Sequence, residues 1–297
     1  MGAVLKRWRK RALEALVIVA VIVGAQYWQT RGLPAGPAPA LAGMLTDGRK
    51  VSLDDTLKAT AGRPVLVDMD PESFGVRPED LEHRLTPKTD GLIVVRGREV
   101  VLERYRGGMT PSTRHLLQSV TKSLCAAVFG RFVGRGEIDP GRTVGSYVAA
   151  LQGSAYGEAT VQQTLDMAVA VAYDETYDDL GSDVNTHDRV SGWKRRRDGD
   201  PSGIAEFLAT LQPSGEHGRR WFYASSNTDV LAWVLESVSG RPFSELLSTE
   251  LWSRMGAEHD AFITVDDHGF ALASGGGCVT LRDLARFGRL LLDGGVG

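Results

Sequence analysis

The chain has 297 residues, of which 42% are hydrophobic and 24% are charged. This is the composition of an ordinary globular protein, and it excludes a disordered or collagen-like chain. The formal net charge is −3, from 34 Lys and Arg against 37 Asp and Glu, so no basic excess points to a nucleic-acid partner. Two cysteines exclude a disulfide-rich scaffold and a four-cysteine metal site.

The N-terminal residues carry the pattern of a membrane anchor. Residues 1–11 are basic, and residues 12–28 hold an uncharged apolar run that ends in Tyr27 and Trp28. As a helix, residues 12–28 would be about 25 Å long, which is the short end of what spans a bilayer. The positive-inside rule then leaves residues 1–11 in the cytoplasm and the rest in the periplasm, as a single-pass inner-membrane protein. A cleaved signal peptide ending near residues 38–40 and a buried soluble helix are the alternatives.

Residues 29–89 are predicted to hold a linker and a remnant of a second fold. The stretch LPAGPAP at residues 33–39 predicts a stiff, extended linker. Residues 40–67, with the anchor and linker before them, resemble the start of membrane-anchored, periplasm-facing thioredoxin-like proteins. In those proteins a strand like that at residues 64–67 runs into a Cys-x-x-Cys helix. No Cys-x-x-Cys occurs in this chain, so the resemblance brings no redox function with it.

From residue 90 onward the pattern predicts strands first and helices afterwards. Apolar runs at residues 92–95 and 100–102 flank a Gly-containing turn at residues 96–99 and predict a strand pair. Thr160 with Gln163 has the form of a capping box. Apolar residues at helical spacing predict further elements, and these helices are expected to begin near Ser119, Thr160, Thr228 and Thr280. This order favours an α+β fold, with a helical subdomain beside an antiparallel sheet, over a wound parallel sheet.

Residues 119–122 form an S-x-x-K tetrad at the start of the first of these helices. Residues three apart lie on one helical face, so the Ser119 hydroxyl and the Lys122 amine can meet. A serine hydroxyl needs a nearby base to become a good nucleophile. A free lysine is protonated at neutral pH and acts as a base only where burial or a neighbouring cation favours the neutral amine. An N-cap serine beside a surface lysine is the alternative interpretation.

The other candidate groups in the sequence do not indicate a second catalytic site or a metal site. A second S-x-x-K match at residues 191–194 runs into three arginines, and we interpret it as a solvated charge run. His187 with Asp188 is interpreted as a surface pair, and no metal site is predicted. The acidic residues within 174–179 are predicted to form a solvated loop, with a flap over the substrate as the alternative. Cys125 is predicted to be buried, and a disulfide between the two cysteines is the alternative.

A tyrosine near the start of the Thr228 helix strengthens the catalytic interpretation of the tetrad. Tyr223 and Ser225 form a Y-x-S motif on the loop that leads into this helix. A tyrosine beside a lysine can move the proton between a nucleophile and a leaving group. A half-buried structural tyrosine is the alternative.

Taken in order, these motifs resemble the serine β-lactamase-related family, which includes class C β-lactamases, related esterases and penicillin-binding proteins. S-x-x-K is followed about a hundred residues later by Y-x-S and then by the Gly-rich stretch 274–277 before the last helix. Residues 173–178 and 226–234 look closest to the 6-aminohexanoate-dimer hydrolase branch. The resemblance covers about residues 90–297 and implies a β-lactamase/transpeptidase-like fold with no metal or organic cofactor.

The resemblance implies a role for each matching residue. Ser119 would be the acylated nucleophile, Lys122 its partner and candidate base, and Tyr223 the general acid/base. The substrate-binding residues that it implies are Tyr173, Ser225 and Asn227. The family's third motif, a Lys- or His-containing Gly-rich strand, would follow the last predicted helix, but the sequence stops at residue 297. We therefore expect a C-terminally incomplete hydrolase domain that turns over poorly or not at all.

The sequence thus predicts an exported, membrane-anchored serine hydrolase that cleaves a small-molecule amide or ester through an acyl-serine intermediate. Two alternatives come from other classes of protein. One is a non-catalytic penicillin-binding sensor, which would acylate without turnover. The other is a membrane-anchored thioredoxin-like adaptor, against which the missing Cys-x-x-Cys counts.

Overall fold

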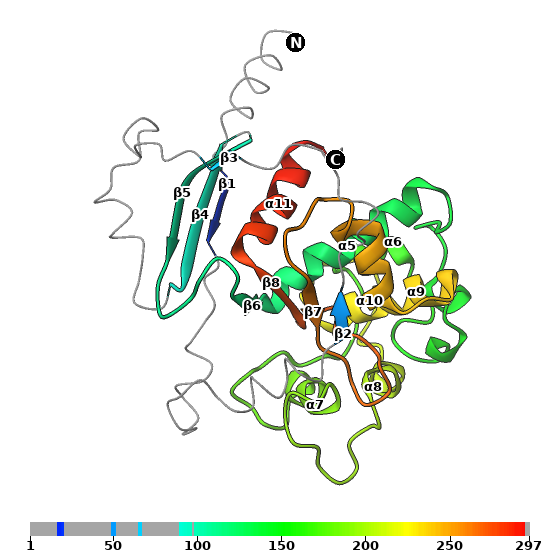
Figure 1. Cartoon of the computed structure of the whole chain (residues 1–297). Helices are drawn as coiled ribbons and strands as arrows, with labels where there is room; N and C mark the ends of the chain where they lie inside the picture. The colour runs from blue at the N-terminus through cyan, green and yellow to red at the C-terminus, as the bar shows by residue number, and fades with distance from the viewer. Residues whose placement is uncertain (1–16, 21–48, 52–64, 67–88, 97, 295–297) are drawn as a thin grey trace.

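The computed structural model describes residues 17–20, 49–51, 65–66, 89–96 and 98–294 (Figure 1). These residues form two four-stranded sheets and a large group of helices. The α+β architecture expected from the sequence, with helices beside antiparallel sheets, is confirmed.

The first sheet has the strand order β1-β4-β5-β3. Strands β4 (Gly91–Arg96) and β5 (Glu99–Tyr105) pair antiparallel, as predicted, and Arg96 lies opposite Glu99. The turn between them is therefore shorter than the four residues expected. Strand β1 (Val17–Ala20) pairs antiparallel with β4, and strand β3 (Val65–Leu66) pairs parallel with β5.

The second sheet is antiparallel throughout and has the order β2-β7-β8-β6. Its strands are β2 (Arg49–Val51), β7 (Ala261–Ile263), β8 (Gly277–Thr280) and β6 (Arg114–Leu116). Strand β8 is buried along its whole length, because it lies in the middle of the sheet and leads directly into helix α11. Strand β6 leads in the same way into the S-x-x-K segment.

The helices pack around one large apolar core. Helices α5 and α9 cross its centre, and Leu124, Val128 and Phe132 of α5 are buried at the spacing that predicted this helix. The capping box of Thr160 with Gln163 is present. In chain order the α-helices are α5 (Thr121–Gly134), α6 (Val161–Leu165), α7 (Asp183–Val190), α8 (Ile204–Thr210), α9 (Ser226–Ser239), α10 (Phe243–Leu246) and α11 (Leu281–Leu292). The remaining helical turns are η3 (Gln118–Val120), η4 (Val144–Ser146), η5 (Ala149–Leu151) and the π-turn η6 (Leu247–Trp252).

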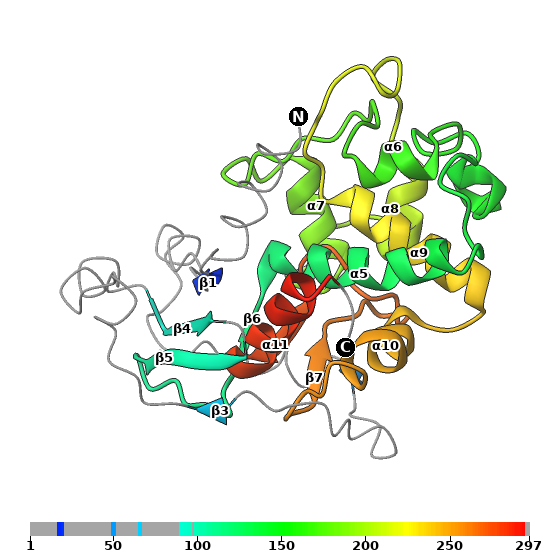
Figure 2. The ribbon, with the colours of Figure 1, turned by 90° about the horizontal axis from the view of Figure 1, so that it is seen from above.

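Helix α11 joins the first sheet to the rest of the molecule (Figure 2). Leu281 and Ala285 on this helix pack against Ile93, Val95 and Val100 of β4 and β5 in a second, smaller apolar cluster. Thr280 caps the helix by accepting a hydrogen bond from the backbone N–H of Asp283, as the sequence predicted.

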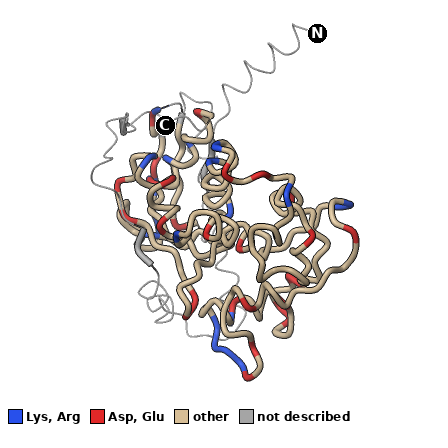
Figure 3. The backbone as a smooth tube through the Cα atoms, turned by 90° about the vertical axis from the view of Figure 1, so that its right-hand side faces the viewer, with Lys and Arg blue, Asp and Glu red and all other residues tan. Residues whose placement is uncertain are grey.

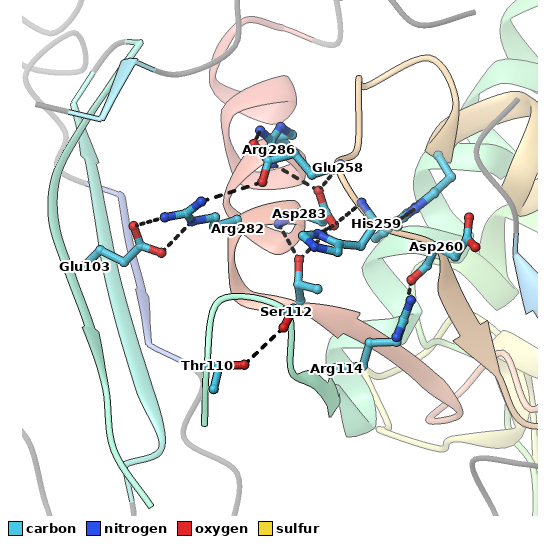
Figure 4. A network of polar contacts seen from close by, with 12 residues as sticks. Glu103, Thr110, Ser112, Arg114, Glu258, His259, Asp260, Arg282, Asp283 and Arg286 are labelled. Atoms are coloured by element: carbon cyan, nitrogen blue, oxygen red, sulfur yellow. Dashed lines mark hydrogen bonds and ion pairs between the residues drawn. The ribbon is translucent and has the colours of Figure 1, made fainter. Parts of the chain in front are cut away.

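A polar network reinforces this junction (Figure 4). Arg282 donates two hydrogen bonds to Glu103 of β5, at 2.7 and 3.1 Å. Arg286 donates to the buried Asp283 at 3.1 Å and also pairs with Glu258. Paired guanidinium and carboxylate groups offset the cost of placing their charges at a partly buried interface. Elsewhere, residues of both charge signs are scattered along the described chain (Figure 3).

The N-terminal predictions fall mostly outside the described residues. Of the predicted anchor, only residues 17–20 are described, and they form strand β1 instead of part of a helix. Among the described residues, no helix has both the length and the apolar character needed to cross a bilayer. In the 29–89 segment, the two described strands, β2 and β3, pair with β7 and β5 and so belong to the same sheets as the hydrolase-like region.

Two further expectations about side chains can be compared with the structure. Cys125 is buried, as predicted, and Cys125 and Cys278 are both free thiols rather than a disulfide. The interpretation of residues 191–194 as a solvated charge run is wrong for the serine, because Ser191 is buried and donates to the backbone carbonyl of Asp188. Lys194 is half-buried and forms an ion pair with Asp188 at 2.7 Å.

Candidate active site

The S-x-x-K tetrad lies where strand β6 turns into helix α5. Gln118 has a positive φ of 49°, a left-handed backbone conformation that is uncommon for a residue with a side chain. This turn directs the exposed Ser119 side chain to the surface from the short helix η3, and Ser119 does not cap a helix. Strained backbone of this kind is often kept at functional sites, where the surrounding structure holds it in place.

Three predicted residues meet at the Ser119 hydroxyl. Lys122 Nζ lies 3.1 Å from Ser119 Oγ, because the two residues are three positions apart along the helical segment. The Tyr223 hydroxyl, from the loop before α9, lies 3.0 Å from the same oxygen. Lys122 Nζ also lies 5.3 Å from the centre of the Tyr223 ring. A nucleophile candidate and two proton-transfer groups are therefore within hydrogen-bond reach of one another.

The Gly-rich stretch before α11 forms one wall of this site. The backbone carbonyl of Ser274 accepts a hydrogen bond of 2.6 Å from Lys122 Nζ, which directs the amine toward Ser119. Gly277 accepts from the backbone N–H of Leu117 at 2.7 Å and donates to Thr121 Oγ1 at 3.0 Å. This stretch therefore holds both ends of the nucleophile turn.

The loop that carries Tyr223 is held by an acidic residue. Glu175 accepts two hydrogen bonds from Ser225, one from the backbone N–H at 2.9 Å and one from the hydroxyl at 2.7 Å. Glu175 also accepts from the Tyr177 hydroxyl at 2.8 Å. Of the two interpretations of residues 174–179, the solvated loop describes the exposed Asp residues, whereas half-buried Glu175 lies against the site.

The three residues expected to contact substrate lie in the interior. Ser225 is occupied by Glu175. Asn227 is fully buried and donates to Met167 Sδ and to the backbone carbonyl of Ala224. Tyr173 is buried, and its hydroxyl lies 3.1 Å from His187 Nδ1. In this arrangement the hydrogen bonds of each of these side chains go to neighbouring residues of the fold.

A buried carboxylate and imidazole lie behind the site, and sequence reasoning missed both. Asp229 of α9 and His187 of α7 face each other at 3.3 Å between Oδ2 and Nε2. Burial raises the pKa of Asp229 to about 7, and burial next to the charge of Lys122 lowers the pKa of His187 to about 3. The interpretation of His187 and Asp188 as a surface pair is therefore wrong. The apolar positions 184 and 190, three residues to either side, place position 187 on the buried face of its helix and could have indicated this.

Exposed large side chains, two of them aromatic, lie at the surface beside the site. Trp221 is 69% exposed and its ring centre lies 6.2 Å from that of Tyr223. Tyr177 and Val120 are also exposed large side chains. A groove of about 660 Å³ lies elsewhere, between α8, the end of α9 with residues 240–242, and the 266–270 loop, and none of these site residues lines it. Within the described part of the chain, no group of His, Cys, Asp and Glu could hold a metal ion.

Comparison with known proteins agrees with this arrangement. A sequence model of the β-lactamase family matches residues 81–297. The chain belongs to the β-lactamase family. A 6-aminohexanoate-dimer hydrolase from Paenarthrobacter ureafaciens is 50% identical over 239 residues, which are 80% of this chain and 60% of that protein. This chain thus spans less than two thirds of the length of this curated family member.

Solved structures support the same β-lactamase-family fold. A structure described as a 6-aminohexanoate-dimer hydrolase from Bacillus anthracis superposes with a TM-score of 0.76 at 25% identity, covering 93% of this chain and 71% of the other. A D-stereospecific amidohydrolase from a Streptomyces species has a TM-score of 0.53 at 19% identity, covering 66% and 65% of the two chains. At that identity the second similarity concerns the fold alone.

Proposed function

We propose that this protein is a serine hydrolase that cleaves a small amide or ester through an acyl-enzyme on Ser119. The observation that supports the proposal most directly is the meeting of Lys122 and Tyr223 at one hydroxyl oxygen, at 3.1 and 3.0 Å. The proposed chemistry uses these three side chains and water. Membership of the β-lactamase family, whose general mechanism passes through an acyl-serine, supports the same proposal.

In the first step Ser119 Oγ attacks the substrate carbonyl carbon while its proton passes to Lys122 or Tyr223. The carbonyl oxygen becomes an oxyanion, which backbone N–H groups near the start of a helix can stabilise. The leaving amine or alkoxide then departs with a proton from the same pair of residues. In the second step water, deprotonated by this pair, attacks the acyl carbon and frees Ser119, so every proton returns to its starting group.

We propose short linear amides of ω-amino acids as the substrate class. The sequence similarity to a protein named 6-aminohexanoate-dimer hydrolase supports this choice. The exposed ring of Trp221 beside Tyr223 supports it as well, because an aromatic face can hold a methylene chain. The second candidate is a penicillin-binding sensor that acylates without turnover, and the exposure of Ser119 is compatible with it.

The experiment combines active-site labelling with turnover. The full chain is treated with a fluorescent fluorophosphonate, and hydrolysis of a chromogenic ester and of a linear 6-aminohexanoate dimer is followed separately. We expect labelling and hydrolysis in the unaltered chain and neither in Ser119→Ala. The matched control is Ser191→Ala, in the other S-x-x-K tetrad, which we expect to label normally. Labelling without turnover favours the sensor, and labelling that persists in Ser119→Ala refutes the proposal.

Export and membrane anchoring by residues 12–28 stay a proposal that rests on the basic cluster and the apolar run. Strand β1 uses four of the same residues, so the strand and a spanning helix are alternatives for this segment. Extraction of membranes at alkaline pH separates them, since an anchored chain stays in the pellet. Release of the full-length chain into the supernatant argues against the anchor.

A further inference from the structure

We propose that Asp229 and His187 are a buried positioning pair. The pair holds the Ser274 backbone behind the nucleophile and determines the negative charge next to Lys122. The proposal rests on the hydrolase function above, and neither residue contacts Ser119. Both side chains are ionisable and buried, with Asp229 0% and His187 3% exposed, and the proposal gives this buried pair a role.

A continuous chain of contacts leads from the pair to the nucleophile. Asp229 Oδ1 accepts a hydrogen bond of 2.9 Å from the backbone N–H of Ser274. The carbonyl of the same residue accepts the 2.6 Å hydrogen bond from Lys122 Nζ. One residue is therefore held at its N–H by Asp229 and holds the amine at its carbonyl. Displacing Ser274 would move the amine relative to Ser119.

The other oxygen of the carboxylate faces the imidazole. Asp229 Oδ2 and His187 Nε2 are both buried, lie 3.3 Å apart, and have no other hydrogen-bond partner among the described residues. On its other side the ring is met by the Tyr173 hydroxyl at Nδ1. Buried polar atoms are costly when unpaired, so two such atoms facing each other indicate a shared proton. When Asp229 is ionised, its Oδ2 is placed to accept a proton that the neutral ring carries on Nε2.

Burial and the nearby amine make the protonation of the pair responsive to pH. Burial raises the pKa of Asp229 to about 7, although the positive charge of Lys122 acts in the opposite direction. The same charge helps to lower the pKa of His187 to about 3. The ionisable groups that surround the pair are Lys122 and Cys125 of α5, Asp188 of α7, and Tyr156, Tyr173 and Glu175 from the loops.

The test measures the second-order rate of Ser119 acylation by a fluorophosphonate from pH 5 to 10. Asp229→Asn keeps an oxygen for the Ser274 N–H but removes the charge. We expect the acid limb of its pH–rate profile to move to lower pH by about one unit, because the negative charge next to Lys122 is lost. Asp229→Ala also loses the acceptor for the Ser274 N–H, and we expect the acylation rate at the optimum pH to fall by about 10²-fold.

The matched control is Asp283→Asn, which alters another fully buried carboxylate whose hydrogen-bond partners all lie outside the site. We expect it to lower stability and to leave the acid limb unmoved. An acid limb in Asp229→Asn that coincides with that of the unaltered chain overturns the proposal. The proposed hydrolase function is tested separately by Ser119→Ala, so loss of labelling there with an unmoved limb in Asp229→Asn rejects the positioning pair alone.

A measurement without any change at the pair covers the case in which the Asp229 variants do not fold. Nitrogen-15 NMR of the unaltered chain follows the ring of His187 between pH 5 and 9. We expect a ring that stays neutral throughout, with one inflection near pH 7 as Asp229 ionises. A ring that protonates near pH 6.5 like a free histidine, or that shows no inflection, overturns the proposal.

Discussion

Replacement of Gly276 by Ala is expected to destabilise the wall behind the nucleophile. A Cβ atom at this position would overlap with Thr264 Oγ1 and would lie 2.9 Å from the backbone oxygen of Leu272 and 3.1 Å from the backbone nitrogen of Thr264. Two of these three atoms belong to the backbone of a paired segment and cannot rotate away. The neighbouring Gly275 offers a matched control, because a Cβ there meets its nearest atom, in Trp193, at 3.5 Å.

Inserting a methyl group into packed structure typically costs about 1–3 kcal/mol, and we expect Gly276→Ala to fall in this range. Gly275→Ala is expected to change the free energy of unfolding by less than about 1 kcal/mol, since the restricted unfolded chain offsets part of any strain. Urea denaturation followed by tryptophan fluorescence measures both. If the two variants unfold at the same urea concentration, the close packing assigned to Gly276 is wrong.

Three further predictions concern the site and the thiols. Tyr223→Phe should lower kcat/KM for the chromogenic ester by about 10²–10⁴-fold while the urea midpoint stays unchanged; full activity would remove Tyr223 from proton transfer. Glu175→Gln should cost about 1–3 kcal/mol in urea denaturation, because the charged acceptor of two hydrogen bonds from Ser225 is lost, and an unchanged midpoint would contradict this. Burial raises the pKa of Cys125, and it raises the pKa of Cys278 to about 12, so neither thiol should react with Ellman's reagent before unfolding; rapid reaction in the folded protein would contradict their burial.

The parts of the fold that follow from local rules could be predicted from the sequence. The capping box at Thr160 and the cap at Thr280 depend on residues three apart, and both are present. The Ser119–Lys122 contact follows from helix geometry over the same short distance. The proximity of Tyr223 could not be worked out from spacing, because 104 residues separate it from Ser119, and it was expected only from the family resemblance.

The parts that depend on long-range packing could not be predicted from the sequence. Nothing near Asp229 indicates that His187 faces it from another helix, and the adjacent Asp188 suggested the wrong partner. The same limit applies to Ser191, where the tetrad matches in sequence but the serine is buried and the lysine pairs with a carboxylate. A short motif shows that the residue types needed for a reaction are present, whereas burial in the fold decides whether they can react.

The central claim is that Ser119 carries a transient acyl group, and intact-mass spectrometry during hydrolysis of a chromogenic ester tests it most directly. The claim predicts a single added acyl mass per chain, located by peptide mapping on the segment that holds Ser119, which decays as free acid appears. It predicts no such mass in Ser119→Ala. Hydrolysis that continues in the Ser119→Ala variant, or an acyl group mapped to another residue, would contradict the claim.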